Sequence, residues 1–173
     1  VSGIEREVYV AAVPKTRIAD FFVHAGLDPQ FRDGRLAVDV AVKGTGAARA
    51  RIVLLDGTRE VLSREAAVGG RGDARSVTIS ADVPGVRQWS AETPNLYTLL
   101  VELVDAQGRV IQSTPQRIGF RDVRMLNGKV TVNGRPIVIR GVNRHEHDPV
   151  TFHVISEESM RRDMELMKRN NFN

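Results

Sequence analysis

Cysteine is absent from all 173 residues of the sequence. This absence excludes disulfides, thiolate metal sites and a cysteine nucleophile. A reducing compartment is the simplest setting for a chain without disulfides, so we predict a cytoplasmic protein. Long apolar runs are also missing. None approaches the roughly 18 residues of a membrane-spanning helix, and no signal peptide opens the chain, so we expect no membrane partner.

Aromatic residues are few, with six Phe, two Tyr and one Trp. The net charge is +4, but Arg and Lys are scattered among acidic residues rather than clustered. A nucleic-acid reader is expected to show a basic stripe or stacking aromatics, so we expect no nucleic-acid partner. An initiator methionine is also lacking. We interpret the sequence as an internal piece of a longer protein, whose first residue carries no information on targeting.

Short strands separated by turn residues dominate the first 120 residues. Apolar residues alternate with polar or small ones in residues 36–42, 77–83 and 97–103. Such a period of two places one face of each strand toward a core and the other toward solvent. Turn-forming sequences such as Asp56-Gly57 and Pro84-Gly85 separate these strands, and no helical pattern lies between them. The pattern predicts a mainly β protein with an antiparallel, immunoglobulin-like sandwich of about 105 residues.

A different pattern begins near Gly119. Residues 130–132 read as a strand, and Asn133-Gly134 is a strong hairpin signal. Residues 137–142 are apolar except for Arg140 and Gly141, which predicts a strand that is covered on both faces.

The chain then closes with one amphipathic helix. Ser156 is a suitable N-cap, and Met160, Met164 and Met167 share one face. We expect ion pairs four residues apart along this helix, and Asn170-Asn171 after its last turn. A strand, a loop and a helix form one βα unit, which is the repeat of a barrel or a doubly wound sheet.

Polar chemistry is concentrated between the predicted strand and helix, in the sequence RGVNRHEHDP that starts at Arg140. In βα-barrels the catalytic groups lie at the carboxyl ends of the strands, which is the position of this cluster. An ordinary polar loop with a satisfied histidine would have the same composition, so spacing alone leaves both interpretations open.

A metal site is a further alternative. His145 and His147 lie two residues apart, and on an extended segment their side chains point to the same side. Two imidazoles are half of a tetrahedral site, to which Asp148 and His153 are the nearest possible additions. A metal-dependent barrel hydrolase that uses His145 and His147 therefore remains open, as does a structural β-sandwich module without catalytic function.

Five stretches together resemble one known family, the large bacterial β-galactosidases of glycoside hydrolase family 2. They are residues 2–8 (SGIEREV), 89–103 (WSAETPNLYTLLVEL), 118–124 (IGFRDVR), 133–149 (NGRPIVIRGVNRHEHDP) and 156–173 (SEESMRRDMELMKRNNFN). The resemblance covers essentially the whole chain. Within the family, His147 favours the galactosidase branch, because the related β-glucuronidases typically carry an acid at that position.

The resemblance implies three parts. Residues 1–13 correspond to the last strand or linker of an N-terminal jelly-roll domain that resembles sugar-binding domains. Residues 14–119 correspond to the immunoglobulin-like sandwich. Residues 120–173 correspond to the start of the catalytic (β/α)8 barrel, with its first hairpin, strand and helix. The barrel is incomplete within these residues.

The activity implied by the resemblance is retaining hydrolysis of β-D-galactosides of the lactose type, as part of carbohydrate metabolism. His145 is expected to bind sugar hydroxyls. No catalytic residue is expected in this chain, because the family's two glutamates lie on later barrel strands. We therefore expect these 173 residues alone to be inactive, without a cofactor of their own. The longer parent is expected to bind magnesium, with sodium as a second ion, and to form a homo-oligomer. The barrel segment is expected to self-associate.

Overall fold

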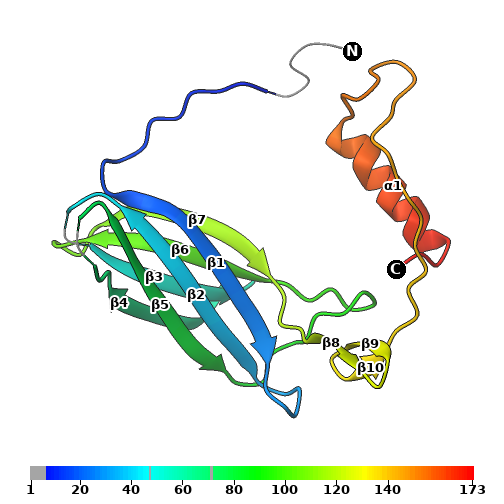
Figure 1. Cartoon of the computed structure of the whole chain (residues 1–173), viewed down its shortest axis with the longest axis horizontal. Coiled ribbons are helices and arrows are strands. Elements are labelled where there is room, and N and C mark those ends of the chain that lie inside the picture. Colours follow the sequence, from blue (N-terminus) through cyan, green and yellow to red (C-terminus); the bar gives the residue numbers. More distant parts are fainter. Residues whose placement is uncertain (1–6, 47, 71) are drawn as a thin grey trace. The chain divides into compact units, whose positions relative to one another are not determined.

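The computed structural model describes residues 7–46, 48–70 and 72–173 (Figure 1). The described chain divides into two compact units. One is Val13–Pro136, and the other combines Ile137–Asn173 with residues 7–12. Residues 7–12 are exposed and have no regular secondary structure. The strand expected over residues 1–13 falls partly outside the described residues.

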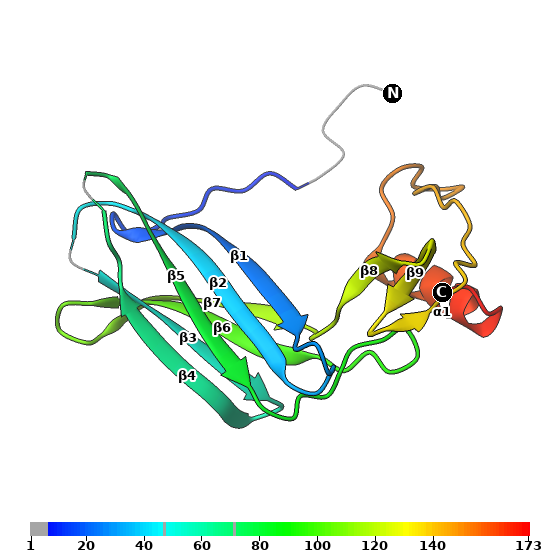
Figure 2. The same cartoon turned by 60° about the horizontal axis from the view of Figure 1, so that its bottom comes forward.

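Two antiparallel sheets make up most of the first unit (Figure 2). The three-stranded sheet has the order β1-β2-β5, and the four-stranded sheet has the order β4-β3-β6-β7. Their bounds are β1 Arg17–Leu27, β2 Gly34–Lys43, β3 Ala48–Asp56, β4 Arg59–Ala67, β5 Ala74–Val83, β6 Tyr97–Asp105 and β7 Val110–Ile118. The predicted immunoglobulin-like sandwich is confirmed. Its fourth strand pairs with β3, so it belongs to the four-stranded sheet rather than to the sheet of β1, β2 and β5.

Alternation along the strands creates the core between the sheets. In β2, Leu36, Val38, Val40 and Val42 are each at most 2% exposed, whereas the residues between them face outward. In β6, Leu99, Val101 and Leu103 are fully buried. The period of two therefore predicted these faces correctly.

Phe120 closes one end of the core just after β7. Its side chain is fully buried and meets the Tyr97 ring edge-on, with 5.4 Å between the ring centroids. Gly34 leaves space for this ring, because a Cβ at that position would lie 2.7 Å from two Phe120 carbons. A glycine is therefore required there for packing rather than for its backbone angles.

A small three-stranded sheet follows, with the order β10-β9-β8. It consists of β8 (Val123–Leu126), β9 (Lys129–Val132) and β10 (Arg135–Pro136). The predicted turn at Asn133-Gly134 is confirmed, with φ values of 50° and 75°. Two positive φ angles in succession define the type I′ turn that this dipeptide favours.

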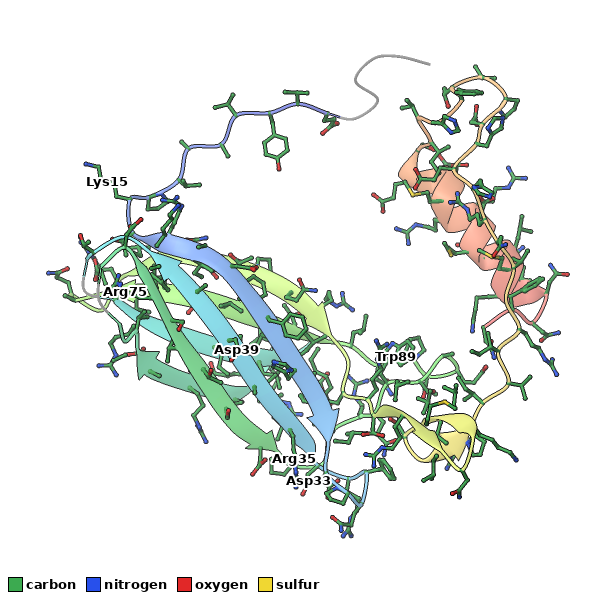
Figure 3. The ribbon with its side chains drawn as sticks, in the orientation of Figure 1. Lys15, Asp33, Arg35, Asp39, Arg75 and Trp89 are labelled. Atoms are coloured by element: carbon green, nitrogen blue, oxygen red, sulfur yellow. The ribbon has the colours of Figure 1, made fainter. Side chains whose placement is uncertain are left out.

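Asn133 also joins this small sheet to the sandwich. Its Oδ1 accepts from the Asp122 amide at 2.9 Å, and its Nδ2 donates to the Trp89 carbonyl at 3.1 Å. On the same side, Gly134 packs so closely that a Cβ there would lie 2.8 Å from the Phe31 ring. These contacts explain why the first compact unit extends to Pro136. Figure 3 shows Trp89 at the end of the sandwich from which β8 continues.

The prediction of a covered strand over residues 137–142 is wrong for the described structure. This stretch forms no regular strand, and Val138 and Ile139 are 72% and 69% exposed. A strand needs neighbours that bond its amides and carbonyls, and among the described residues only Asn173 bonds to this stretch.

The predicted helix is confirmed as α1 (Glu157–Arg169). The Ser156 hydroxyl accepts from the Ser159 amide at 3.1 Å, and Asn170 is the C-cap. Two of the expected ion pairs are present, Glu157–Arg161 and Glu165–Arg169. No residue of α1 is buried, and Met164 is 52% exposed. No helix in the described part of the chain has the length and apolar character that spanning a membrane requires.

Candidate functional site

The candidate site is the loop between the extended residues 137–142 and α1. Asn173 holds the start of this segment. Its Oδ1 accepts from the Arg140 amide at 2.9 Å, its own amide donates to the Arg140 carbonyl at 3.0 Å, and its Nδ2 donates to the Val138 carbonyl at 2.9 Å. One asparagine therefore binds the extended segment much as a neighbouring strand would.

Arg144 fixes the middle of the loop to the helix. Its Nε and Nη2 each lie 2.8 Å from Oδ2 of Asp163 in α1. The Arg144 side chain is 20% exposed and that of Asp163 is 44% exposed, so the pair is only partly shielded from water. A guanidinium that donates twice to one carboxylate is more strongly oriented than a single ion pair. This contact sets the backbone next to His145.

His145 is exposed and makes no hydrogen bond or ion pair with another described residue. Its ring nitrogens are therefore open to a ligand. A neutral imidazole offers one donor and one acceptor, which suits two neighbouring hydroxyl groups of a sugar. The structure places the predicted substrate-binding residue where a ligand can reach it.

Asp148 organises the second half of the loop. Backbone bonds join Asp148 and Phe152 in both directions, at 2.7 and 2.9 Å. The Asp148 carboxylate also accepts from the amides of Val150 at 2.8 Å and Thr151 at 2.9 Å. Donation from the Thr151 and Val150 amides lowers the pKa of Asp148 below its usual value. This carboxylate is therefore committed to holding the turn.

Three aromatic rings gather at the same turn. The His147 ring lies 5.0 Å from that of Phe152 and 5.7 Å from that of His153, between centroids. His153 Nδ1 donates to the Glu146 carbonyl at 2.8 Å. His147 therefore packs within the loop rather than sharing a ligand position with His145.

The metal alternative required His145, His147, Asp148 and His153 to converge. They do not, because Asp148 bonds loop amides and His153 bonds the Glu146 backbone. Within the part of the chain that the structure describes, no group of three His, Asp or Glu side chains is suited to hold a metal ion. The His-x-His spacing alone is insufficient.

Two positioning contacts were not predicted from the sequence, namely Arg144–Asp163 and the bonds of Asn173. The paired residues lie 19 to 35 positions apart. Nothing in the local sequence around Arg144 or Asn173 indicates these partners, because the contacts depend on how the helix returns to the extended segment.

Comparisons with known proteins cover the whole chain. The family model of the glycosyl hydrolases family 2 matches residues 16–121, and the model of the family 2 TIM barrel domain matches residues 123–173. A β-galactosidase of Photobacterium profundum is 39% identical over 180 residues, covering 100% of this chain and 18% of that protein. A β-galactosidase of Pseudoalteromonas haloplanktis is 38% identical over 182 residues, covering 100% of this chain and 17% of that protein. The chain thus spans less than a fifth of the length of these relatives.

Solved structures with the same fold include two β-glucuronidases. That of Parabacteroides merdae has a TM-score of 0.78 at 21% identity, covering 92% of this chain and 20% of that one. That of Ruminococcus gnavus, in complex with D-glucuronic acid, has a TM-score of 0.77 at 25% identity, covering 92% of this chain and 26% of that one.

Proposed function

Because the chain belongs to the glycosyl hydrolases of family 2, we propose that it supplies the sandwich and the first barrel segment of an enzyme that hydrolyses β-D-galactosides. The observation that carries this proposal is the identity of 38–39% to curated β-galactosidases across the full length of this chain. The aligned region includes the loop that carries His145.

The proposed division of work follows from the chemistry of retaining glycosidases. One carboxyl group protonates the leaving oxygen while a second attacks the sugar, and both must flank the scissile bond. In this proposal both carboxylates come from outside the 173 residues. His145 contributes a hydrogen bond to sugar hydroxyls, and this bond accelerates the reaction if it strengthens as the ring distorts toward the transition state.

Arg144 and Asp163 act in this proposal as positioning residues. The two hydrogen bonds from Arg144 to Asp163 hold the residue before His145 against α1. Asn173 holds Arg140 and Val138 in an extended conformation. The loop segment that leads to the histidine therefore has two polar anchors, and displacement of a binding group by about 1 Å is enough to slow an enzyme strongly.

Magnesium is proposed only for the longer enzyme. The described residues contain no group of three carboxylate or imidazole side chains that fits a metal ion. We therefore assign no metal-dependent step to this chain.

Hydrolysis of β-glucuronides is the second candidate, favoured by the fold shared with the two glucuronidases. The higher identity to β-galactosidases argues against it, as does the presence of His147 at the position where an acid is typical of glucuronidases. Rates of the longer enzyme on matched chromogenic β-galactoside and β-glucuronide substrates separate the two candidates. Faster turnover of the glucuronide would refute the substrate assignment.

His145→Ala in the longer enzyme tests the role of the loop. We expect kcat/KM for a chromogenic β-galactoside to fall about 10–1000-fold, which corresponds to roughly 1.4–4 kcal/mol of transition-state stabilisation. Gln107→Ala, in the exposed turn between β6 and β7, is the control and should leave the rate unchanged. Unchanged kinetics of the His145 variant would leave this chain only a scaffolding role. The 173 residues alone should give no turnover, and a rate that His145→Ala abolishes would contradict the proposed location of the carboxylates.

A further inference from the structure

The outer edge of β1 is a free strand edge over its central residues. β1 is the last strand of its sheet and pairs only with β2, in regular register from Asp20 to Leu27. The Ala25 carbonyl accepts from the Arg121 amide at 3.3 Å, and the Phe21 amide donates to the neighbouring Asp20 Oδ1 at 2.8 Å. Since backbone groups alternate between the two sides of an antiparallel strand, Phe21, Val23 and Ala25 direct their amides and carbonyls away from β2.

A groove of about 830 Å³ runs along this edge. It is lined on one side by β1, including Asp20, Phe22 and Val23, and on the other by β7, including Gln116 and Arg117. Both ends of β1 are tied across to the other side of the sandwich. The Ile18 amide donates to Gln112 Oε1 at 2.8 Å, and the Ala25 carbonyl accepts from Arg121. The stretch between these ties therefore has open backbone groups and open space beside them.

Two of the other three edge strands of the sandwich, β7 and β4, carry features that discourage pairing, and the third, β5, is bridged at Ser76 by Gly69. β7 contains Pro115, which has no amide proton, and β4 is rich in charged residues. β1 has neither Pro nor Lys between Ile18 and Leu27. Its central outward side chain is Phe22, which is 65% exposed and meets the edge of the His24 ring at 4.8 Å.

The residues around Phe22 are complementary to themselves. Asp20 and His24 lie two positions before and after it, and all three are exposed on the same face. In an antiparallel pairing of two copies centred on Phe22, each Asp20 lies opposite His24 of the other copy. The interface therefore contains two symmetry-related pairs of a carboxylate and an imidazole. The same register places Phe21 opposite Val23 of the other copy, which matches the two residues whose amides and carbonyls point outward. A non-hydrogen-bonded pair at Phe22 brings the two rings together at the closest strand spacing.

We propose that β1 is a homodimer interface, at which two copies of this chain pair antiparallel through residues 20–24 across a two-fold axis centred on Phe22. The two three-stranded sheets then form one continuous six-stranded sheet. Dimer formation requires Asp20 to release the Phe21 amide, and its carboxylate then faces His24 of the second copy. His24 Nε2 already lies 3.0 Å from Asp39 Oδ2, so Asp20 of the second copy either bonds the other ring nitrogen or competes with Asp39. A two-fold interface of this kind closes after two copies and does not propagate. The proposal is independent of the enzymatic function.

Sedimentation of the 173-residue chain over a concentration series tests this interface. We expect a monomer–dimer equilibrium that Phe22→Lys abolishes, because a lysine at the centre of each edge places two like charges together. Val110→Lys is the matched control, since it adds the same charge to an exposed residue of β7, an edge strand of the other sheet, and should leave the dimer intact. Asp20→Lys should weaken the dimer by about 2–30-fold, since two cross-strand pairs of about 0.2–1 kcal/mol each are lost.

Hydrogen exchange provides the second readout, because amide protection at Phe21 and Val23 should rise with protein concentration in the unmodified chain. A chain that stays monomeric at every concentration overturns the proposal. A dimer that survives in folded Phe22→Lys but disappears in Met164→Lys overturns it as well, since association would then run through residues 137–173. If Phe22→Lys lowers the thermal stability of the monomer, two other measurements test the interface. They are the dimer affinity of Asp20→Lys and the concentration dependence of hydrogen exchange at the Val23 amide.

Discussion

Different forces stabilise the two regions of this chain internally. In Val13–Pro136, two sheets enclose a continuous core, and every buried hydrophobic residue of the described chain lies between Ile18 and Phe120. In Ile137–Asn173 no residue is buried, and Val138, Ile139 and Val150 are 72%, 69% and 89% exposed. Order in the second region depends on one helix, the two hydrogen bonds from Arg144 to Asp163, the bonds of Asn173 and the turn held by Asp148.

This difference separates stability from the candidate function. Apolar burial contributes roughly 25 cal/mol per Å² of surface removed from water, so the sandwich holds almost all of the hydrophobic stabilisation. Partly exposed ion pairs contribute at most about 1 kcal/mol each. The loop that carries His145 is therefore expected to open locally at little cost while the sandwich remains folded.

Removal of a core side chain should show the largest contrast. We predict that Phe120→Ala lowers the free energy of unfolding by about 3–5 kcal/mol, because it leaves a cavity beside Tyr97. Phe152→Ala is the matched change in the other region, where the ring is 45% exposed, and should cost less than about 0.5 kcal/mol. Urea denaturation followed by circular dichroism measures both, and equal losses would refute the contrast.

Addition of one methyl group should show the same contrast at smaller scale. Gly34→Ala places a Cβ 2.7 Å from the Phe120 ring and 2.9 Å from Val86, so we predict a loss of about 1–3 kcal/mol. Gly141→Ala meets only Ile139 Cγ2, at 3.8 Å, and should change the stability by less than about 0.5 kcal/mol. Thermal melts of the two variants compare them directly. A neutral Gly34→Ala would mean that Phe120 is packed loosely.

Acid should weaken both regions through carboxylates that bond backbone amides. The Arg32 amide lowers the pKa of Asp28, the Arg109 amide lowers that of Asp105, and the Thr151 amide lowers that of Asp148. A lowered folded-state pKa adds stability above the unfolded value of about 4, and this stability is lost as the pH falls through the folded-state value. We predict that the melting temperature of the sandwich falls below about pH 4, and that Asp105→Asn reduces this dependence. Asp148→Asn should leave it unchanged, because Asp148 lies in the other region.

The sequence predicted the sandwich well because its signal is local. Alternation in residues 36–42 identifies buried and exposed faces without reference to any partner strand. Residues 137–142 show the opposite case. Their continuous apolar character predicted a covered strand, but coverage depends on neighbours that no described segment of this chain provides. Asn133 and Arg144 illustrate the same limit, since a turn residue that also bonds Trp89 and an arginine that bonds Asp163 have no signature in neighbouring residues.

Amide hydrogen exchange across the whole chain tests the central claim most directly, because it reads the local stability of both regions in one sample. We predict that amides of β2, β3 and β6 exchange only through global unfolding, and that β9, joined to the sandwich by the neighbouring Asn133, is protected well above the candidate loop. Amides of residues 137–155 should exchange orders of magnitude faster than those of β6, with α1 intermediate. Protection of residues 137–155 equal to that of β6 would contradict the account, because a segment without buried side chains would then be as stable as the core.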